Sequence, residues 1–142
     1  MSPMPPIIRL ATPRDVPAMH AIRLDVHENR LSSPARVTEQ DYYQYIAASS
    51  AWVAEMDGRV VGFAAANKDS IWALFVSPST EKRGIGRLLH TRLIVWAKTL
   101  GLDRLTLTTA AGTRAEGFYR RLGWCSPDTE PDGSMRFTWR ME

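Results

Sequence analysis

The sequence predicts one domain of the α/β (α+β) class, with about four helices and a mixed, mostly antiparallel sheet of six to seven strands. Its 142 residues are close to the usual size of a single domain. Residues 70–108 read as strand, helix and strand, which predicts a central parallel β-α-β unit. Asp57-Gly58 separates two apolar runs and predicts an antiparallel hairpin, because this dipeptide tolerates the positive φ of a tight turn.

Four helices are expected from their caps and apolar spacing. Each begins at a polar cap or a glycine turn and ends at a glycine, a proline or a polar break. The third has the clearest apolar stripe, and Gly101 is typical of the position just after a helix. The expected spans are Thr12 to about Glu28, Thr38 to about Ser49, Ile85 to Leu100, and Thr113 to Leu122.

Strands are expected where short apolar runs lack helical spacing. The run from Ser70 to Val76 is nearly continuous and predicts a strand buried on both faces. The last strand, around residues 136–140, is apolar and aromatic, and we expect it at a sheet edge where it could pair across a homodimer. The expected strands are residues 7–10, 51–56, 60–64, 70–76, 105–108, 124–126 and 135–141.

Composition excludes several kinds of site and location. The single cysteine, Cys125, cannot form an intrachain disulfide, and three widely spaced histidines give no reason to expect a metal site. We expect Cys125 to be a small buried side chain. The proline-rich residues 1–6, expected to be extended or disordered, lack the features of a signal peptide, and no apolar run could span a membrane. We therefore expect a cytoplasmic protein without membrane contact.

The positive charges indicate a small anionic ligand rather than a nucleic acid. The net charge is only +3, and the densest basic stretch has four cations, Lys82, Arg83, Arg87 and Arg92. Gly84-Ile85-Gly86 opens the third helix, where unpaired backbone N–H groups and the helix dipole favour an anion such as a pyrophosphate. The segment lacks the Gly-Lys-Ser/Thr of a Walker loop and the third glycine of a dinucleotide fingerprint.

Two segments together resemble the signatures of the GNAT superfamily of N-acyltransferases. Val76-x-Pro78 followed by Lys82-Arg83-Gly84-Ile85-Gly86-x-x-Leu89 resembles its acyl-CoA-binding motif. Gly112 to Trp124 resembles its second motif, with an alanine, an aromatic-tyrosine pair and a terminal glycine plus aromatic. The order of elements resembles that of the family from Ile7 to Trp139. The resemblance implies a single N-acetyltransferase domain over residues 7–142, with acetyl-CoA as cosubstrate and no metal. The sequence departs from the family pattern at Glu81, usually Arg or Gln, and at Gly112, near a frequent Asn.

The resemblance also implies which residues bind acetyl-CoA. The backbone amides of the turn and of the helix start would hold the pyrophosphate, and those of the preceding strand would hold the thioester and the pantetheine arm. The aromatic pair of the second motif would lie beside them. The residues implied are Leu74, Phe75, Val76, Lys82, Arg83, Gly84, Ile85, Gly86, Arg87, Phe118 and Tyr119.

Acyl transfer to an amine needs an acid for the leaving thiolate and a way to remove the amine proton. The resemblance implies Tyr119 as the general acid. For the base, Glu28 is one candidate, Glu55 and the Asp69-Ser70 pair are rivals, and a chain of water molecules is an alternative. The acceptor would bind under the first two helices, between Leu24 and Tyr45, with Trp72 as a wall.

The predicted function is direct transfer of an acetyl group from acetyl-CoA to a primary amine of a small molecule, amino acid or peptide, within a ternary complex. The alternative is a non-catalytic acyl-CoA sensor or interaction module on the same fold. That alternative follows from Glu81 and from the absence of an obvious base. A nucleic-acid-binding domain would rest only on net charge and is not expected.

Overall fold

One seven-stranded sheet organises the part of the chain described by the computed structural model, namely residues 5–26, 37–80, 83–110, 112–129, 131 and 134–141. The strand order is β1-β2-β3-β4-β5-β7-β6. Only β4 and β5 run parallel, and the other neighbours are antiparallel. The predicted fold class is thus confirmed. The strands are β1 (Ile7–Leu10), β2 (Ala51–Met56), β3 (Arg59–Asn67), β4 (Ser70–Val76), β5 (Arg104–Ala110), β6 (Cys125–Thr129) and β7 (Ser134–Arg140).

The helices begin at the predicted caps. Asp15 and Asp41 each accept a hydrogen bond from the backbone N–H three residues earlier, closing capping boxes with Thr12 and Thr38. The first helix ends at Asp25 in the described residues, and the expected end at Glu28 lies outside them. The helical elements are η1 (Pro13–Asp15), α1 (Val16–Asp25), η3 (Glu39–Tyr42), α3 (Tyr43–Ala47), η4 (Pro78–Thr80), α4 (Ile85–Thr99) and α5 (Arg114–Leu122).

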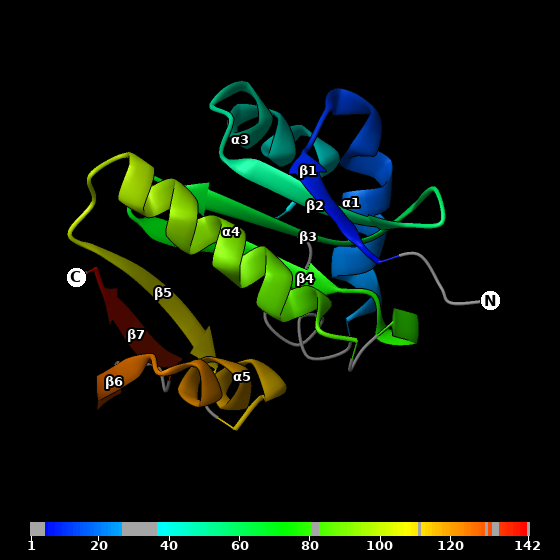
Figure 1. Ribbon diagram of the computed structural model, residues 1–142. Coiled ribbons are helices and arrows are strands. Elements are labelled where there is room, and N and C mark those ends of the chain that lie inside the picture. The colour runs from blue at the N-terminus through cyan, green and yellow to red at the C-terminus, as the bar shows by residue number, and fades with distance from the viewer. Residues whose placement is uncertain are drawn as a thin grey trace.

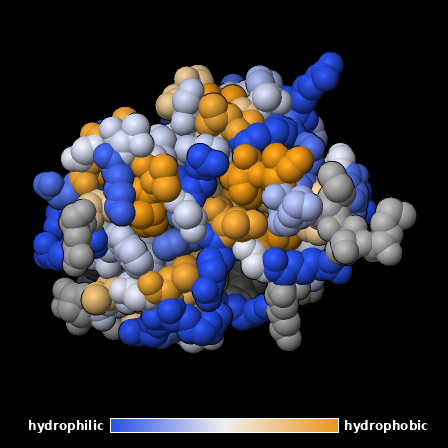
Figure 2. All heavy atoms as spheres, in the orientation of Figure 1, coloured by the Kyte–Doolittle hydropathy of each residue, from blue (hydrophilic) through white to orange (hydrophobic). Residues whose placement is uncertain are grey.

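Helices cover both faces of the sheet and divide its core in two. One core lies between the sheet and α4, with side chains of α5 joining it, and the other lies beneath α1 and α3. Figure 1 shows α4 crossing in front of the strands, with α1 behind them. The outer side of α4 still exposes Leu88 and Val95, and this view of the surface mixes hydrophobic patches with hydrophilic side chains (Figure 2).

The sheet opens between its two parallel strands. Ser70 opposite Thr106 is the one aligned pair of β4 and β5 in the described residues, and the strands then diverge toward α5 (Figure 1). The prediction that β4 is buried on both faces is therefore wrong for its second half. Ile71 and Ala73 are buried, whereas Leu74 to Val76 are only half-buried because no strand adjoins them on that side.

The last strand is not at an edge. β7 pairs with β5 on one side and with β6 on the other, so the expected homodimer contact through residues 136–140 loses its basis. Because β7 lies between β5 and β6, although it follows β6 in the sequence, β1 and β6 are the edge strands. Cys125, at the start of β6, is exposed rather than buried as expected.

Candidate functional site

The start of α4 presents unpaired backbone N–H groups. Gly84 caps the helix with a φ of 79°, a left-handed conformation that favours glycine. The first helical hydrogen bond runs from the N–H of Leu88 to the carbonyl of Gly84, so the N–H groups of residues 85–87 have no acceptor within the helix. Arg83 and Arg87 are exposed beside them. Lys82, another of the four cations of the basic stretch, and Glu81 lie outside the described residues.

Three elements meet at the second glycine of this turn. A Cβ added to Gly86 would lie 3.3 Å from the ring of Phe118 on α5 and 3.7 Å from a methyl group of Val76 on β4. Gly86 therefore lets the first turn of α4 approach both the end of β4 and the middle of α5. The two motifs, separated by a strand in the sequence, are adjacent in the structure.

Three residues of β4 are expected to bind acetyl-CoA through their backbone, and two of them have backbone groups on the open side of the strand. The N–H of Ser77 donates to the carbonyl of Val61 on β3 at 2.7 Å. Backbone groups alternate along an antiparallel strand, so those of Phe75 also face β3, while those of Leu74 and Val76 face the gap toward β5. A Cβ added to Gly62 would meet the carbonyl oxygen of Phe75 at 3.1 Å, in agreement with this direction. The geometry narrows the expected backbone contacts to Leu74 and Val76.

Tyr119 lies on α5, directly after Phe118, whose ring borders Gly86. Its side chain is buried, and burial raises the pKa of its hydroxyl above the usual value. Its ring packs edge-on against Phe118, at 5.1 Å between centroids, and Trp124, at 5.4 Å. The hydroxyl has no hydrogen-bond partner among the described residues, and its raised pKa keeps it protonated at neutral pH.

A hydrogen bond that the sequence did not reveal joins α4 to Trp124, which lies just after the end of α5. The indole Nε1–H of Trp124 donates to Nε2 of buried His90 at 2.8 Å, so this nitrogen of His90 carries no proton. Burial, aided by the charge of Arg87, lowers the pKa of His90 to about 4. Backbone N–H of Trp124 also donates to the carbonyl of Tyr119. His90 thus fixes the end of the helix that carries Tyr119.

The start of α5 is ordered by its own side chains. The carboxylate of Glu116 accepts from the N–H of Gly112 at 2.7 Å and from Nε of Arg120 at 2.8 Å. These two bonds lower the pKa of Glu116. The hydroxyl of Thr113 caps the helix by accepting from the N–H of Glu116 at 3.3 Å. Gly112 lies near a position where the family often has Asn, and its backbone N–H already donates to Glu116.

Two of the three carboxylate candidates for the base, Glu55 and Asp69, are described by the structure, and neither lies at the site. Glu28 lies outside the described residues. Glu55 accepts two hydrogen bonds from Arg9, at 3.0 and 3.2 Å, so a structural ion pair already occupies it. Asp69 lies where β4 and β5 remain paired, near the other end of α4 from Gly84, and this helix of 15 residues is about 22 Å long.

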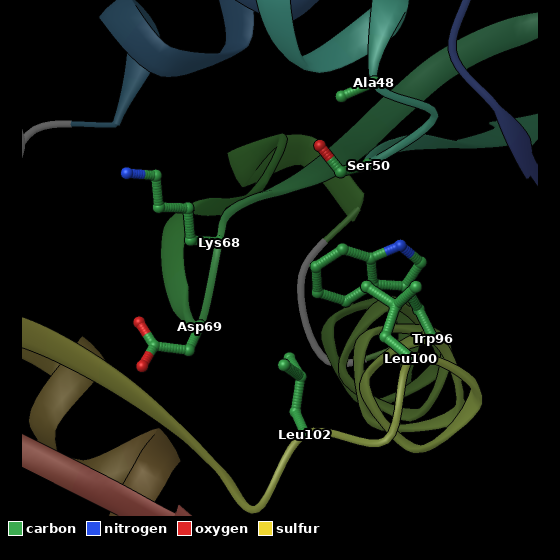
Figure 3. Close-up of a pocket in the computed structure, with 7 residues that line it drawn as sticks. All are labelled: Ala48, Ser50, Lys68, Asp69, Trp96, Leu100 and Leu102. Carbon is green, nitrogen blue, oxygen red and sulfur yellow. The ribbon is translucent and has the colours of Figure 1, made fainter.

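Asp69 borders a separate open pocket at that far end. The pocket has a volume of about 580 Å³, and Trp96 of α4 and Leu100, the residue after this helix, form one of its walls (Figure 3). The side chains of Lys68 and Asp69 stand on the opposite side of this space (Figure 3). Its lining comprises Ala48, Ser50, Lys68, Asp69, Trp96, Leu100 and Leu102. No residue of either motif lines it.

The expected acceptor side contains a cluster of aromatic rings around an arginine. The pairing of β3 with β4 passes from Ala73 directly to Ile71, so Trp72 is an extra, bulged residue. The bulge turns Trp72 to the α1/α3 face, where Tyr45 stacks on it at 4.4 Å. The guanidinium of Arg23 lies over Trp72. We call Arg23, Tyr42, Tyr45, Trp72 and Phe75 the Arg23 cluster.

Neither a metal cluster nor a membrane span is found in the described part of the chain. No group of three or more His, Cys, Asp or Glu side chains there could hold a metal ion. No helix there has both the length and the apolar character needed to cross a bilayer.

Comparison with known proteins identifies the family. The model of the acetyltransferase (GNAT) family matches residues 16–124. Serotonin N-acetyltransferase 2, chloroplastic, from Oryza sativa subsp. japonica is 32% identical over 131 residues, covering 84% of this chain but only 62% of the relative.

Solved structures share the fold over nearly the whole chain. A GCN5-related N-acetyltransferase from Rhodopseudomonas palustris superposes with a TM-score of 0.80 at 20% identity, covering 99% of both chains. The structure of yncA from Salmonella typhimurium, solved with its cofactor acetyl-CoA, gives a TM-score of 0.78 at 18% identity, covering 96% of this chain and 94% of the other. With the family model spanning both sequence motifs, the chain belongs to the acetyltransferase (GNAT) family.

Proposed function

We propose that this protein is an N-acetyltransferase that transfers an acetyl group from acetyl-CoA to a primary amine of a small molecule, amino acid or peptide. The observation that carries the proposal is the meeting of three elements at Gly86. The unpaired N–H groups of α4, the open backbone of β4 and the helix of Tyr119 converge there. Acetyl-CoA bound to yncA, a protein of the same fold, is consistent with this choice of donor.

Each of these elements would bind one part of the donor. The N–H groups of residues 85–87, with Arg83 and Arg87, would hold the pyrophosphate. Leu74 and Val76 would hydrogen-bond the amides of the pantetheine arm and the thioester carbonyl, as a neighbouring strand would. Phe118 would border the arm where it passes Gly86.

Direct transfer would then need one proton donor and one proton acceptor. The amine nitrogen bonds to the acetyl carbon, the carbon–sulfur bond breaks, and the electron pair leaves with sulfur. Tyr119 would give its hydroxyl proton to that thiolate, whose own pKa rises in a dry site. The proton lost by the amine would pass to Glu28, or to water, and restore the tyrosine through solvent. Glu28→Gln tests the first of these routes.

The test combines binding and turnover. Calorimetry should show acetyl-CoA binding, and thiol release over a panel of amines should show turnover with at least one amine. No binding at high micromolar acetyl-CoA would exclude the proposal. Binding without turnover on any polyamine, aminoglycoside, amino acid or short peptide would instead support a non-catalytic acyl-CoA sensor.

A further inference from the structure

The place of the Tyr119 hydroxyl depends on how its ring is packed. No described residue hydrogen-bonds this hydroxyl, and the ring lies against those of Phe118, Trp124 and Phe137, the last at 6.3 Å between centroids. In a close-packed core, a ring that is held by packing moves when a neighbouring ring moves. The position of the hydroxyl therefore depends on what holds these neighbours.

Trp124 is held by hydrogen bonds to both helices. Its backbone N–H donates to the carbonyl of Tyr119 on α5 at 3.0 Å. Its indole N–H donates to Nε2 of His90 on α4 at 2.8 Å, and both side chains are buried. Because burial and the charge of Arg87 lower the pKa of His90 to about 4, this ring is neutral and Nε2 stays an acceptor throughout the neutral range. The backbone and the side chain of Trp124 are thus both fixed.

His90 lies one turn along α4 from Gly86, on the same face of the helix. Its ring is edge-on to that of Phe118, at 6.4 Å between centroids, and to that of Trp139 on β7, at 5.4 Å. The ring of Phe118 also borders Gly86. The first two turns of α4 therefore carry both the N–H groups that would hold the pyrophosphate and the acceptor that fixes Trp124.

We propose that His90 is a positioning residue: through Trp124 it sets where the hydroxyl of Tyr119 lies relative to a donor bound at the start of α4. This role rests on the proposed N-acetyltransferase function, with Tyr119 as its acid. His90 acts through its neighbour and exchanges no proton in the reaction. Its loss should lower kcat only while the hydroxyl of Tyr119 is present, whereas a merely structural residue would affect the rate with or without that hydroxyl.

The experiment removes the acceptor of this hydrogen bond with and without the hydroxyl of Tyr119. With an amine that the wild type acetylates, His90→Leu should lower kcat by about 10- to 100-fold and change the affinity for acetyl-CoA by less than about 3-fold. His90→Gln can still accept from Trp124 and should recover most of the loss. In the Tyr119→Phe background, His90→Leu should change the remaining kcat by less than about 3-fold. Initial rates and calorimetry measure kcat and affinity.

Controls separate positioning from stability. Ile94→Ala, one turn further along α4, leaves a cavity in the same core and keeps both partners of the hydrogen bond. It should lower the thermal unfolding midpoint and leave kcat unchanged, with all rates measured below the lowest midpoint. If His90→Leu does not fold, Trp124→Phe removes the donor of the same bond and takes its place. An unchanged kcat in the folded variant, or an equal loss in the Tyr119→Phe background, would overturn the inference.

Two outcomes separate this inference from the proposed function. Acetylation that Tyr119→Phe leaves unchanged keeps the function and overturns the inference. If no amine turns over, the NMR signals of the Tyr119 ring decide, assigned among the four tyrosines by Tyr119→Phe. Signals that shift or broaden in His90→Leu, and not in His90→Gln or Ile94→Ala, support the positioning role. Signals that are unchanged in His90→Leu, or that change as much in Ile94→Ala, overturn it.

Discussion

The burial of Tyr119 determines how an acid in this position would behave. Because burial raises the pKa of the hydroxyl, the group holds its proton throughout the neutral range. Titration of Tyr119 would therefore not limit activity near neutral pH. A fall in rate at lower pH would come from protonation of the acceptor amine or of its base.

Tyr119→Phe should lower kcat by about 100-fold or more while changing the affinity for acetyl-CoA by less than about 3-fold. The phenyl ring keeps the packing against Phe118 and Trp124 and removes only the hydroxyl. Single-turnover rates and calorimetry measure the two quantities. An unchanged kcat would reject the acid role.

Among the elements, α4 is flanked by one glycine at each end, and the two glycines have similar backbone conformations. Gly84 precedes the helix with a φ of 79°, and Gly101 follows it with a φ of 75°. A Cβ would meet no atom within 4 Å at either position. Alanine at either site should therefore impose a similar backbone strain, about 1–2 kcal/mol.

Gly84→Ala and Gly101→Ala thus form a matched pair. Both should lower the free energy of unfolding by a similar amount, but only Gly84→Ala should weaken acetyl-CoA binding, by about 10-fold, because it disturbs the N–H groups of the first turn. Urea unfolding and calorimetry give the two measurements. Equal weakening by both variants would place the pyrophosphate elsewhere.

The N-terminal elements are joined through one arginine. Arg9 on β1 bonds both carboxylate oxygens of Asp15 in η1, at 2.8 and 3.0 Å, and also reaches Glu55 on β2. Arg9→Met should lower the free energy of unfolding by about 1–3 kcal/mol, because Asp15, with an 8% exposed side chain, loses its partner. Arg59→Met, at an exposed position, should change it by less than about 0.5 kcal/mol. Comparable losses in both would argue against this bridge.

For the whole molecule, His90 makes stability depend on pH. Its pKa is 6.5 ordinarily and about 4 in the folded protein, so between these values only the unfolded chain binds the proton. The free energy of unfolding should therefore fall as the pH decreases through this range, by about 2 kcal/mol at pH 5. His90→Gln, which can still accept from Trp124, should flatten this slope in urea unfolding at pH 7 and 5. An unchanged slope would assign it to other groups.

Much of the fold was predictable from local signals. Capping residues at Thr12 and Thr38, the Asp57-Gly58 turn and the stripe of α4 each act over a few residues, and each predicted start or turn is confirmed. The family followed from two motifs in order, and the family model confirms it. These features depend on neighbours in the chain, which a single sequence displays.

The rest depends on contacts between distant segments. The apolar run of β4 does not reveal that β5 leaves it after Ser70, nor that Trp72 is an extra, bulged residue. The pattern of residues 136–140 is the same for an edge strand and for an inner strand, so the place of β7 could not be derived. The bond between His90 and Trp124 spans 34 residues and has no local signal.

The gap between β4 and β5 divides the sheet into two halves, which share one aligned pair in the described part of the chain. Strands β1 to β4 come from the first part of the chain and β5 to β7 from the last, with α4 as the link along the sequence. A ligand that carries amide groups would bind between the two halves in the way that an eighth strand would. Binding of such a ligand would couple the unfolding of the two halves. It would also slow the exchange of the Leu74 and Val76 amide protons with solvent.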